Sequence, residues 1–173
     1  ELFAFWDGAL ARWGITPSGL TGRPVPKTDR VLSCAFADGA LVLGTGQGAL
    51  VLRAWNTAQE TSEFFEFGYV QAQISANGLW LSARKSSPPA VQIYRLNPWA
   101  PRGAVMFDAD IVAQAFTPRS DELAVVTRDA IAFLDTEHWR PVRRMELPVE
   151  RNARLLFAPD GASFWLSPDL RNA

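Results

Sequence analysis

The residues that come closest to a known chemical motif are the glycines of a short stretch, Gly44, Gly46 and Gly48. Glycine-rich loops of this kind cradle phosphates when a strand precedes them and a helix follows, because the N–H groups at the helix start face the anion. Here the next segment, Ala49–Trp55, is mostly apolar and predicts a strand. The glycines therefore predict a hairpin between two strands rather than a phosphate site.

General-base chemistry would need the only histidine, His138, which follows Glu137. No serine or cysteine nucleophile stands in a recognisable setting near this pair. The single cysteine, Cys34, excludes an intrachain disulfide framework and a multi-cysteine metal cluster. Its neighbours Ala35 and Phe36 are apolar, which predicts a buried thiol without a catalytic role. We expect a protein that is not an enzyme.

Metal binding would need clustered ligands, and the sequence has two close carboxylate pairs. They are Asp108 with Asp110, and Asp121 with Glu122. Neither pair resembles a calcium loop. We expect no metal and no cofactor, although inward-facing residues of separate strands would form a central site that spacing does not reveal.

Seven tryptophans are the largest group of side chains able to bind a ligand or partner by stacking. Five fall within apolar strands, where we expect them to pack in the core: Trp6, Trp13, Trp55, Trp80 and Trp165. Trp99 and Trp139 fall in connections between strands. We predict these two as partner contacts, with simple packing over a turn as the alternative.

A basic stretch follows Trp139 and contains Arg140, Arg143 and Arg144. We include these three arginines among the possible partner contacts. Adjacent residues of a strand point to opposite faces, so Arg143 and Arg144 would not form one continuous patch. Glutamates at 137, 146 and 150 dilute the charge, and a solvated edge strand is the simpler explanation. An acidic partner is the alternative.

Composition narrows the class of protein. The chain has 173 residues, 48% of them hydrophobic, and a net charge of −1, which gives no field favouring nucleic acid or an anionic membrane. No apolar run reaches the roughly 18–20 residues of a membrane span, and no signal peptide opens the chain. We expect a cytoplasmic location. Only Lys27 and Lys85 are lysines among 17 basic residues, which suggests a GC-rich, bacterial genome.

These residues are positioned by a repeat. The third apolar segment of each unit begins at Ala9, Ala49, Ala90 and Ala130, at spacings of 40, 41 and 40 residues. A second set of positions, Phe36, Ile74, Phe116 and Phe157, is spaced by 38, 42 and 41. Two anchors agree on a period of about 40–42 residues, which is the length of one β-propeller blade.

The turns agree with this period, because Asp38-Gly39, Asn77-Gly78 and Asp160-Gly161 separate first from second strands. The segment from Phe157 to Gly161 reads F-A-P-D-G and resembles the F-S-P-D-G turn of WD40 repeats. The resemblance covers nearly the whole chain, but the repeats are degenerate. WD40 repeats usually carry Trp-Asp after the third strand, and here these positions read Trp55-Asn56, Leu96-Asn97 and Leu134-Asp135. The Gly-His that usually precedes the first strand is missing. The Asp–His–Ser–Trp network of WD40 blades therefore cannot form, and the generic blade is shared with PQQ-like, YVTN-like and TolB-like propellers.

The predicted fold is all-β, a β-propeller of four-stranded antiparallel blades with about four blades present. We expect a partial blade at about 1–28, complete blades at about 30–68, 69–108 and 110–149, and a partial blade at about 151–173. The strand count begins and ends on a second strand. We therefore expect a segment of a larger propeller rather than a closed four-bladed ring.

The resemblance to WD40-like propellers implies a function of one class. It implies a scaffold or sensor platform that binds another protein or another domain of the parent chain. The alternatives are an enzyme or cofactor-binding propeller, such as a quinoprotein, a lactonase-like hydrolase or a peptidase gating domain, and a structural subunit of an assembly. Fold alone does not separate these classes.

Overall fold

The structure of the chain is a computed structural model. It describes the backbone of residues 2–6, 9–16, 19–24, 31–37, 40–45, 48–53, 61–66, 71–96, 99–149 and 153–168. Side chains are described for Leu41 and for residues 71–96, 100–149 and 153–167. In these residues every regular element is a β-strand.

The strands form five antiparallel sheets, and each sheet takes its strands in chain order. The first sheet contains β1 (Leu2–Trp6), β2 (Ala9–Thr16) and β3 (Gly19–Pro24). The second contains β4 (Val31–Ala37), β5 (Ala40–Thr45), β6 (Gly48–Arg53) and β7 (Thr61–Glu66). The third contains β8 (Gln71–Ile74), β9 (Trp80–Ser86), β10 (Pro89–Leu96) and β11 (Trp99–Met106). The fourth contains β12 (Ile111–Phe116), β13 (Glu122–Thr127), β14 (Ala130–Asp135) and β15 (Pro141–Glu146), and the fifth contains β16 (Ala153–Phe157) and β17 (Phe164–Pro168).

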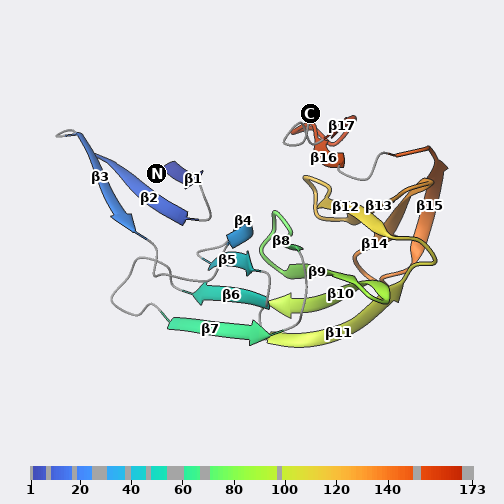
Figure 1. Ribbon diagram of the computed structural model, residues 1–173, viewed down its shortest axis with the longest axis horizontal. Helices are drawn as coiled ribbons and strands as arrows, with labels where there is room; N and C mark the ends of the chain where they lie inside the picture. The colour runs from blue at the N-terminus through green and yellow to red at the C-terminus, as the bar shows by residue number, and fades with distance from the viewer. Residues whose placement is uncertain are drawn as a thin grey trace.

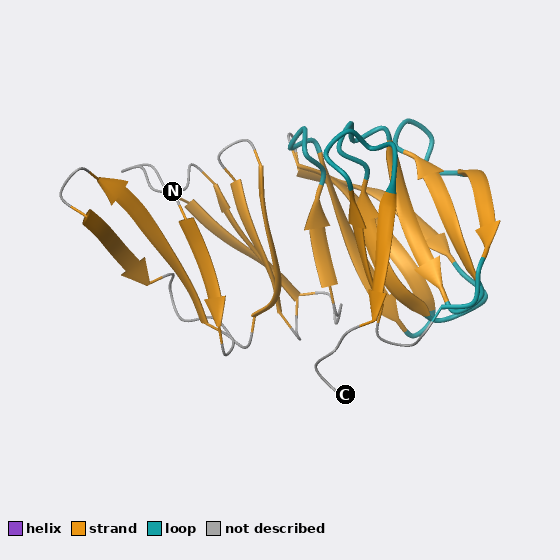
Figure 2. Ribbon diagram, turned by 90° about the horizontal axis from the view of Figure 1, so that it is seen from above, coloured by secondary structure: helices purple, strands orange, loops and turns teal. Residues whose placement is uncertain are grey.

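The five sheets follow one another in an open arc, with the β1–β3 sheet at one end and the β16–β17 sheet at the other (Figure 1). The first strands of successive sheets are neighbours, since β4 contacts β8 and β12 contacts β16. These strands line the inner side of the arc, while β7, β11 and β15 lie on its outer side. Seen from above, the sheets lie side by side along the arc (Figure 2). The predicted all-β fold of four-stranded antiparallel blades is confirmed.

The hairpins between first and second strands share one geometry. Gly78 and Gly161 have φ angles of 68° and 72°, as the Asn-Gly and Asp-Gly pairs predict. In the hairpin that lacks glycine, Ser120 takes the same position with a φ of 61°. In all three, the N–H of this residue donates to the carbonyl three residues earlier, at 2.9 Å. The third predicted turn, Asp38-Gly39, lies outside the described residues.

Hydroxyl groups link the hairpins of two neighbouring blades. The Ser75 hydroxyl donates to Asn77 Oδ1 at 2.7 Å, and the Asn77 N–H donates to Ser120 Oγ at 3.1 Å. Thr136 Oγ1 then donates to the Ser120 carbonyl at 2.9 Å. This chain of hydrogen bonds joins the β8–β11 blade to the β12–β15 blade without any histidine or tryptophan, in a protein whose sequence excludes the WD40 network.

The β12–β15 blade is packed on both faces. Along β13 and β14, alternate side chains enter two different clusters, as the pleat of a strand requires. The first blade interface, between β8–β11 and β12–β15, contains Val91, Ile93, Ile111, Leu123, Val125 and Leu134. The second blade interface, between β12–β15 and β16–β17, contains Ala113, Ala115, Ala124, Val126, Ile131, Phe133 and Leu155. Burial on both faces explains why β13 and β14 read as continuous apolar runs.

One tryptophan predicted to lie in the core does not. Trp165 on β17 is 58% exposed, and Leu156, directly opposite on β16, is 59% exposed. Both point away from the second blade interface, on a face that no described residue covers. The sequence assigned Trp165 correctly to a second strand, but its pattern did not reveal which face of the sheet is covered. The side chains of Trp6, Trp13 and Trp55 lie outside the described residues.

Candidate partner-contact surface

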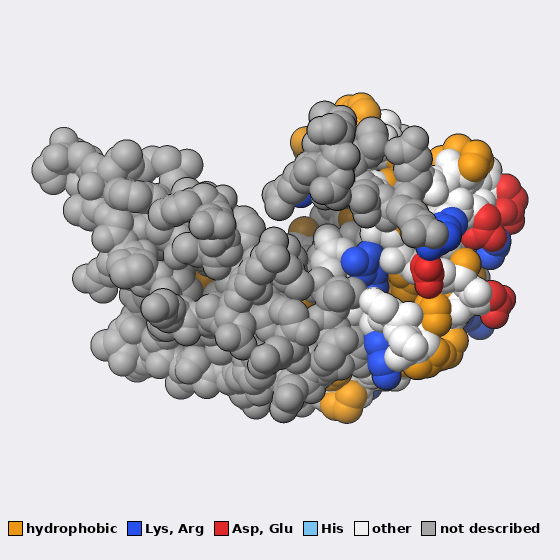
Figure 3. Space-filling view, in the orientation of Figure 1, with side chains coloured by type: hydrophobic (Ala, Val, Ile, Leu, Met, Phe, Trp, Pro, Cys, Tyr) orange, Lys and Arg blue, Asp and Glu red, His pale blue; other side chains and the backbone are white. Residues whose placement is uncertain are grey.

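The predicted contact arginines lie on or beside β15, the outer strand of the fourth sheet. All six residues of this strand are exposed. Val142 and Met145 are apolar yet 53% and 43% exposed, and Leu147 just beyond the strand is 37% exposed. Figure 3 shows basic, acidic and hydrophobic side chains intermixed on this outer side of the molecule. The strand is therefore a mixed surface rather than a purely charged edge.

Arg143 and Arg144 lie on opposite faces of β15, as the strand pleat predicts. The Arg143 guanidinium lies 3.6 Å from the centre of the Phe133 ring and donates to Glu122 Oε2 at 2.6 Å. It therefore covers the ring of Phe133, a member of the second blade interface. A cation held over an aromatic face gains electrostatic attraction from the ring.

Arg144 has a different set of partners. Its Nε donates to Glu146 Oε1 at 2.7 Å, and its Nη2 lies 3.6 Å from Asp129 Oδ2. The hydrogen bond to Glu146 raises the pKa of Arg144 above its ordinary value. The pKa of Asp129 lies below its ordinary value, mainly because the Thr127 hydroxyl donates to that carboxylate. Exposed pairs of this kind contribute little to folding, so they hold the arginine in place more than they stabilise the fold.

Trp139 is partly buried, and its ring packs against other aromatic side chains. Its ring contacts Trp80 edge-on, with 5.0 Å between centroids, and lies 6.5 Å from Phe116. The ring packs against the first blade interface. The backbone of Trp139 has a positive φ of 57°. The structure therefore favours the packing alternative for this residue over a contact with a partner. The side chain of Trp99 lies outside the described residues, although its backbone begins β11.

The turn that holds Trp139 is organised by Asp135. Its Oδ1 accepts hydrogen bonds from the backbone N–H of His138 at 2.6 Å and of Glu137 at 3.1 Å. Burial raises the pKa of Asp135, but the hydrogen bonds from His138 and Arg140 outweigh this and leave the pKa below its ordinary value. His138 Nδ1 lies 3.2 Å from the same oxygen, and the side chain is 53% exposed. Arg140 is 71% exposed, with its Nε 4.0 Å from Asp135 Oδ2.

Arg140 thus lies just before β15, Arg143 and Arg144 lie on opposite faces of it, and Trp139 packs against neighbouring aromatic rings. Sequence reasoning missed Val142 and Met145 as exposed members of the same strand. The signal was present, because the two apolar residues fall on opposite faces of a strand whose other positions are Pro, Arg and Glu. We call Arg140, Val142, Arg143, Arg144 and Met145 the β15 surface.

The structure also places the glycine-rich stretch and part of the carboxylate groups. The glycine-rich stretch joins β5 to β6, so a strand follows it and not a helix. Within the described ranges no three His, Cys, Asp or Glu side chains gather in a way that would hold a metal ion. Those same ranges contain no helix long and apolar enough to cross a membrane.

No protein-family model matches the sequence, and no curated protein matches it either. Solved structures do. A chain of the crystal structure of a mitotic checkpoint complex superposes on 96% of this chain with a TM-score of 0.75 and 15% identity. A chain of the hydrazine synthase of Kuenenia stuttgartiensis superposes on 91% with a TM-score of 0.73 and 14% identity. The fold is that of a β-propeller. The chain spans about half of each neighbour, 53% and 48% of their lengths.

Proposed function

We propose that this propeller arc is a non-catalytic, WD40-like platform for protein–protein interaction, and that the β15 surface contacts the partner. The observation that supports this most is the composition of that strand. Protein interfaces are enriched in Met and Arg and depleted in Lys, Glu and Asp relative to the remaining surface. Val142 and Met145 are both exposed on a strand that carries two arginines, one glutamate and no lysine or aspartate.

The geometry of the arginines also suits this role. Arg143 is held over Phe133 and against Glu122, so its side chain would lose less conformational freedom on binding than a free arginine. Arg140 extends from the neighbouring turn with 71% of its side chain exposed. A partner with acidic and apolar side chains in alternation would match this strand. The partner is another protein or another domain of the same parent chain, and the location is the cytoplasm.

The two structural neighbours come from a protein complex and from an enzyme, according to their titles. At 15% and 14% identity they support the fold and leave the choice of function open. An enzyme or cofactor-binding propeller is the competing class. Native protein purified with a stoichiometric metal or quinone, measured by elemental analysis and absorbance, would contradict the platform function.

A photo-crosslinking amino acid at Val142 tests the platform function directly. We expect one discrete crosslinked protein from native cells with the probe at position 142. The same probe at Leu79, which is 41% exposed on a hairpin far from β15 in the chain, is the matched control. Met145→Ser together with Arg144→Glu should remove the crosslink while the far-ultraviolet circular dichroism is retained. A crosslink equal at positions 79 and 142, or unaffected by the double substitution, would contradict the proposal.

A further inference from the structure

The first blade interface contains a polar cluster that the second lacks. Ser82 on β9 is fully buried and Gln114 on β12 is 1% exposed. In the second blade interface, Ser82 is replaced by Ala124 and Gln114 by Leu155, both at equivalent positions in their hairpins. Polar side chains this deeply buried usually have hydrogen-bond partners, because an unpaired buried polar atom is costly.

The orientation of the Gln114 amide is fixed by the opposite blade. Its Nε2 donates to the carbonyls of Gln71 at 3.3 Å and Ser82 at 3.4 Å. Rotating the amide by 180° would place its oxygen against these two carbonyl oxygens, and neither has a hydrogen to donate. The acceptor Oε1 is therefore directed elsewhere within the interface, and it has no protein donor among the described residues.

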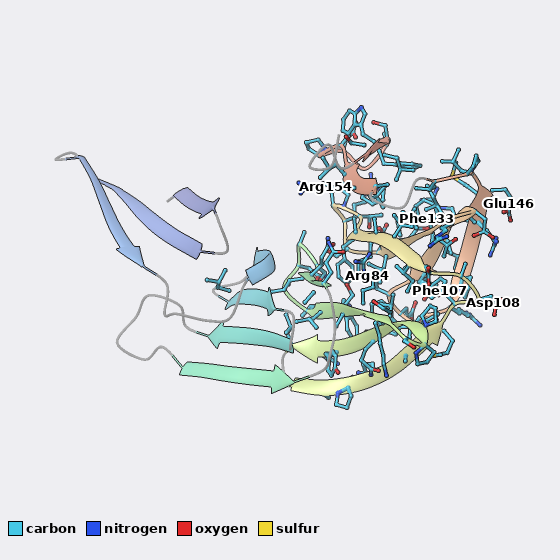
Figure 4. All side chains as sticks on the ribbon, viewed as in Figure 1. Arg84, Phe107, Asp108, Phe133, Glu146 and Arg154 are labelled. Atoms are coloured by element: carbon cyan, nitrogen blue, oxygen red, sulfur yellow. The ribbon has the colours of Figure 1, made fainter. Side chains whose placement is uncertain are left out.

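Two more buried polar atoms belong to the same side of β9. The Ser82 hydroxyl and the Arg84 Nε–H both have no hydrogen-bond partner in the described part of the chain. Arg84 lies between β9 and β12 (Figure 4), and its Nη1 donates to the carbonyls of Ile111, at 2.9 Å, and Val112. Its Nε is a donor, Gln114 Oε1 is an acceptor, and a serine hydroxyl does both.

We propose that one buried water molecule binds in the first blade interface and bridges Ser82 Oγ to Gln114 Oε1. The chemistry of the cluster selects water over an ion. The partial negative charge of the Gln114 amide oxygen would repel an anion, and the positive charge of the Arg84 guanidinium would repel a cation. Water both donates and accepts, and buried waters in proteins typically make two to four such bonds. The molecule joins β9 to β12 and completes the hydrogen bonding that the two side chains begin.

A crystal structure of the protein at about 1.5 Å resolution tests this assignment. We expect one well-ordered density peak within about 2.6–3.2 Å of both Ser82 Oγ and Gln114 Oε1. Two results would overturn the proposal. One is an interface without density at that position. The other is a Ser82 hydroxyl that donates directly to Gln114 Oε1.

Oxygen-17 magnetic relaxation dispersion, which counts long-lived internal waters, gives the matching test in solution. Gln114→Leu removes the acceptor, and we expect the count to fall by one relative to the unmodified chain. Thr127→Ala is the control, because its hydroxyl already bonds to Asp129 at 2.6 Å and Ala130 at 3.1 Å. If Gln114→Leu does not fold, Ser82→Ala removes the other partner and should give the same loss. An unchanged count in the folded variant would overturn the proposal.

Discussion

The β12–β15 blade and the β16–β17 sheet carry the same hairpin in two different environments. Ala115 pairs with Ala124 one step in from the turn of the first hairpin, and Leu156 pairs with Trp165 at the same step of the second. The alanines are 9% and 0% exposed, whereas Leu156 and Trp165 are 59% and 58% exposed. The difference lies in what covers each face, since the β16–β17 sheet packs over the alanines.

The sizes of the side chains in the second blade interface are related to this arrangement. Small residues on the β12–β15 blade leave room for larger side chains from the next sheet, and Leu155, Phe157, Phe164 and Leu166 of β16 and β17 pack there. At this part of the interface, small side chains of one blade therefore lie opposite large side chains of the next, as close packing requires.

The largest loss of stability should come from a substitution in the β12–β15 blade, which is packed on both faces. Phe133→Ala leaves a cavity in the second blade interface, where Phe133 is fully buried and contacts Phe164 at 6.3 Å between centroids. We expect a loss of about 3–5 kcal/mol in the free energy of unfolding, measured by urea denaturation. Val142→Ala, on the exposed neighbouring strand, is the control and should change stability by about 0.5 kcal/mol or less. A loss below about 1 kcal/mol for Phe133→Ala would contradict the described packing.

A smaller loss should follow Arg84→Met. Arg84 donates to two carbonyls where the β12–β13 pairing shifts register between Ile111 and Ala113. Burial lowers the pKa of this guanidinium, and its hydrogen bonds offset part of the cost of burying the charge. Leaving the carbonyls unpaired should cost about 1–3 kcal/mol in urea denaturation. Arg144→Met, which removes only exposed ion pairs, is the matched control, and equal effects of the two changes would show that Arg84 does not join the blades.

Trp165→Ser should have almost no effect on stability, despite the loss of a large aromatic ring. We expect a change of about 0.5 kcal/mol or less, because more than half of the side chain is already exposed. The fraction of tryptophan fluorescence that acrylamide quenches should also fall. Trp80→Ser is the comparison, since its ring packs against Trp139, and it should cost about 3 kcal/mol. Similar losses for the two tryptophans would mean that the outer face of β17 is covered.

The smallest predicted effect is a change in the pKa of one carboxyl group, that of Asp129. Thr127→Val removes the hydroxyl that lowers the pKa of Asp129, so that pKa should rise toward the ordinary value of about 3.9. A lowered carboxyl pKa stabilises the folded state above the unfolded-state pKa, and this contribution is lost as pH falls through the folded-state value. The variant should therefore lose slightly less stability on acidification below about pH 4. Carboxyl carbon chemical shifts measure the pKa directly, and an unchanged value would rule out control by Thr127.

Periodicity and turn chemistry were sufficient to predict the blades. Asn77-Gly78 and Asp160-Gly161 predicted the left-handed turn positions. The hairpin closed by Ser120 was harder to predict, because serine carries no preference for a positive φ comparable to that of glycine. Its conformation depends on hydrogen bonds from Asn77 and Thr136, which come from distant parts of the sequence.

The candidate site was predicted only in part. The position of Arg143 and Arg144 on opposite faces follows from strand geometry alone. The packing of Trp139 does not, because it depends on contact with Trp80 of a different blade. The polar cluster of Ser82, Arg84 and Gln114 is likewise absent from any local pattern, since its members meet only when two blades pack together.

Amide hydrogen exchange, followed by mass spectrometry or NMR, tests most directly whether the blades are packed as described. The account predicts the slowest exchange in β13 and β14, which are paired on both edges and buried on both faces. It predicts much faster exchange in β17, which among the described strands pairs only with β16 and has one covered face. Equal protection of β17 and β13 would contradict this difference between the two regions and with it the described arrangement of the blades.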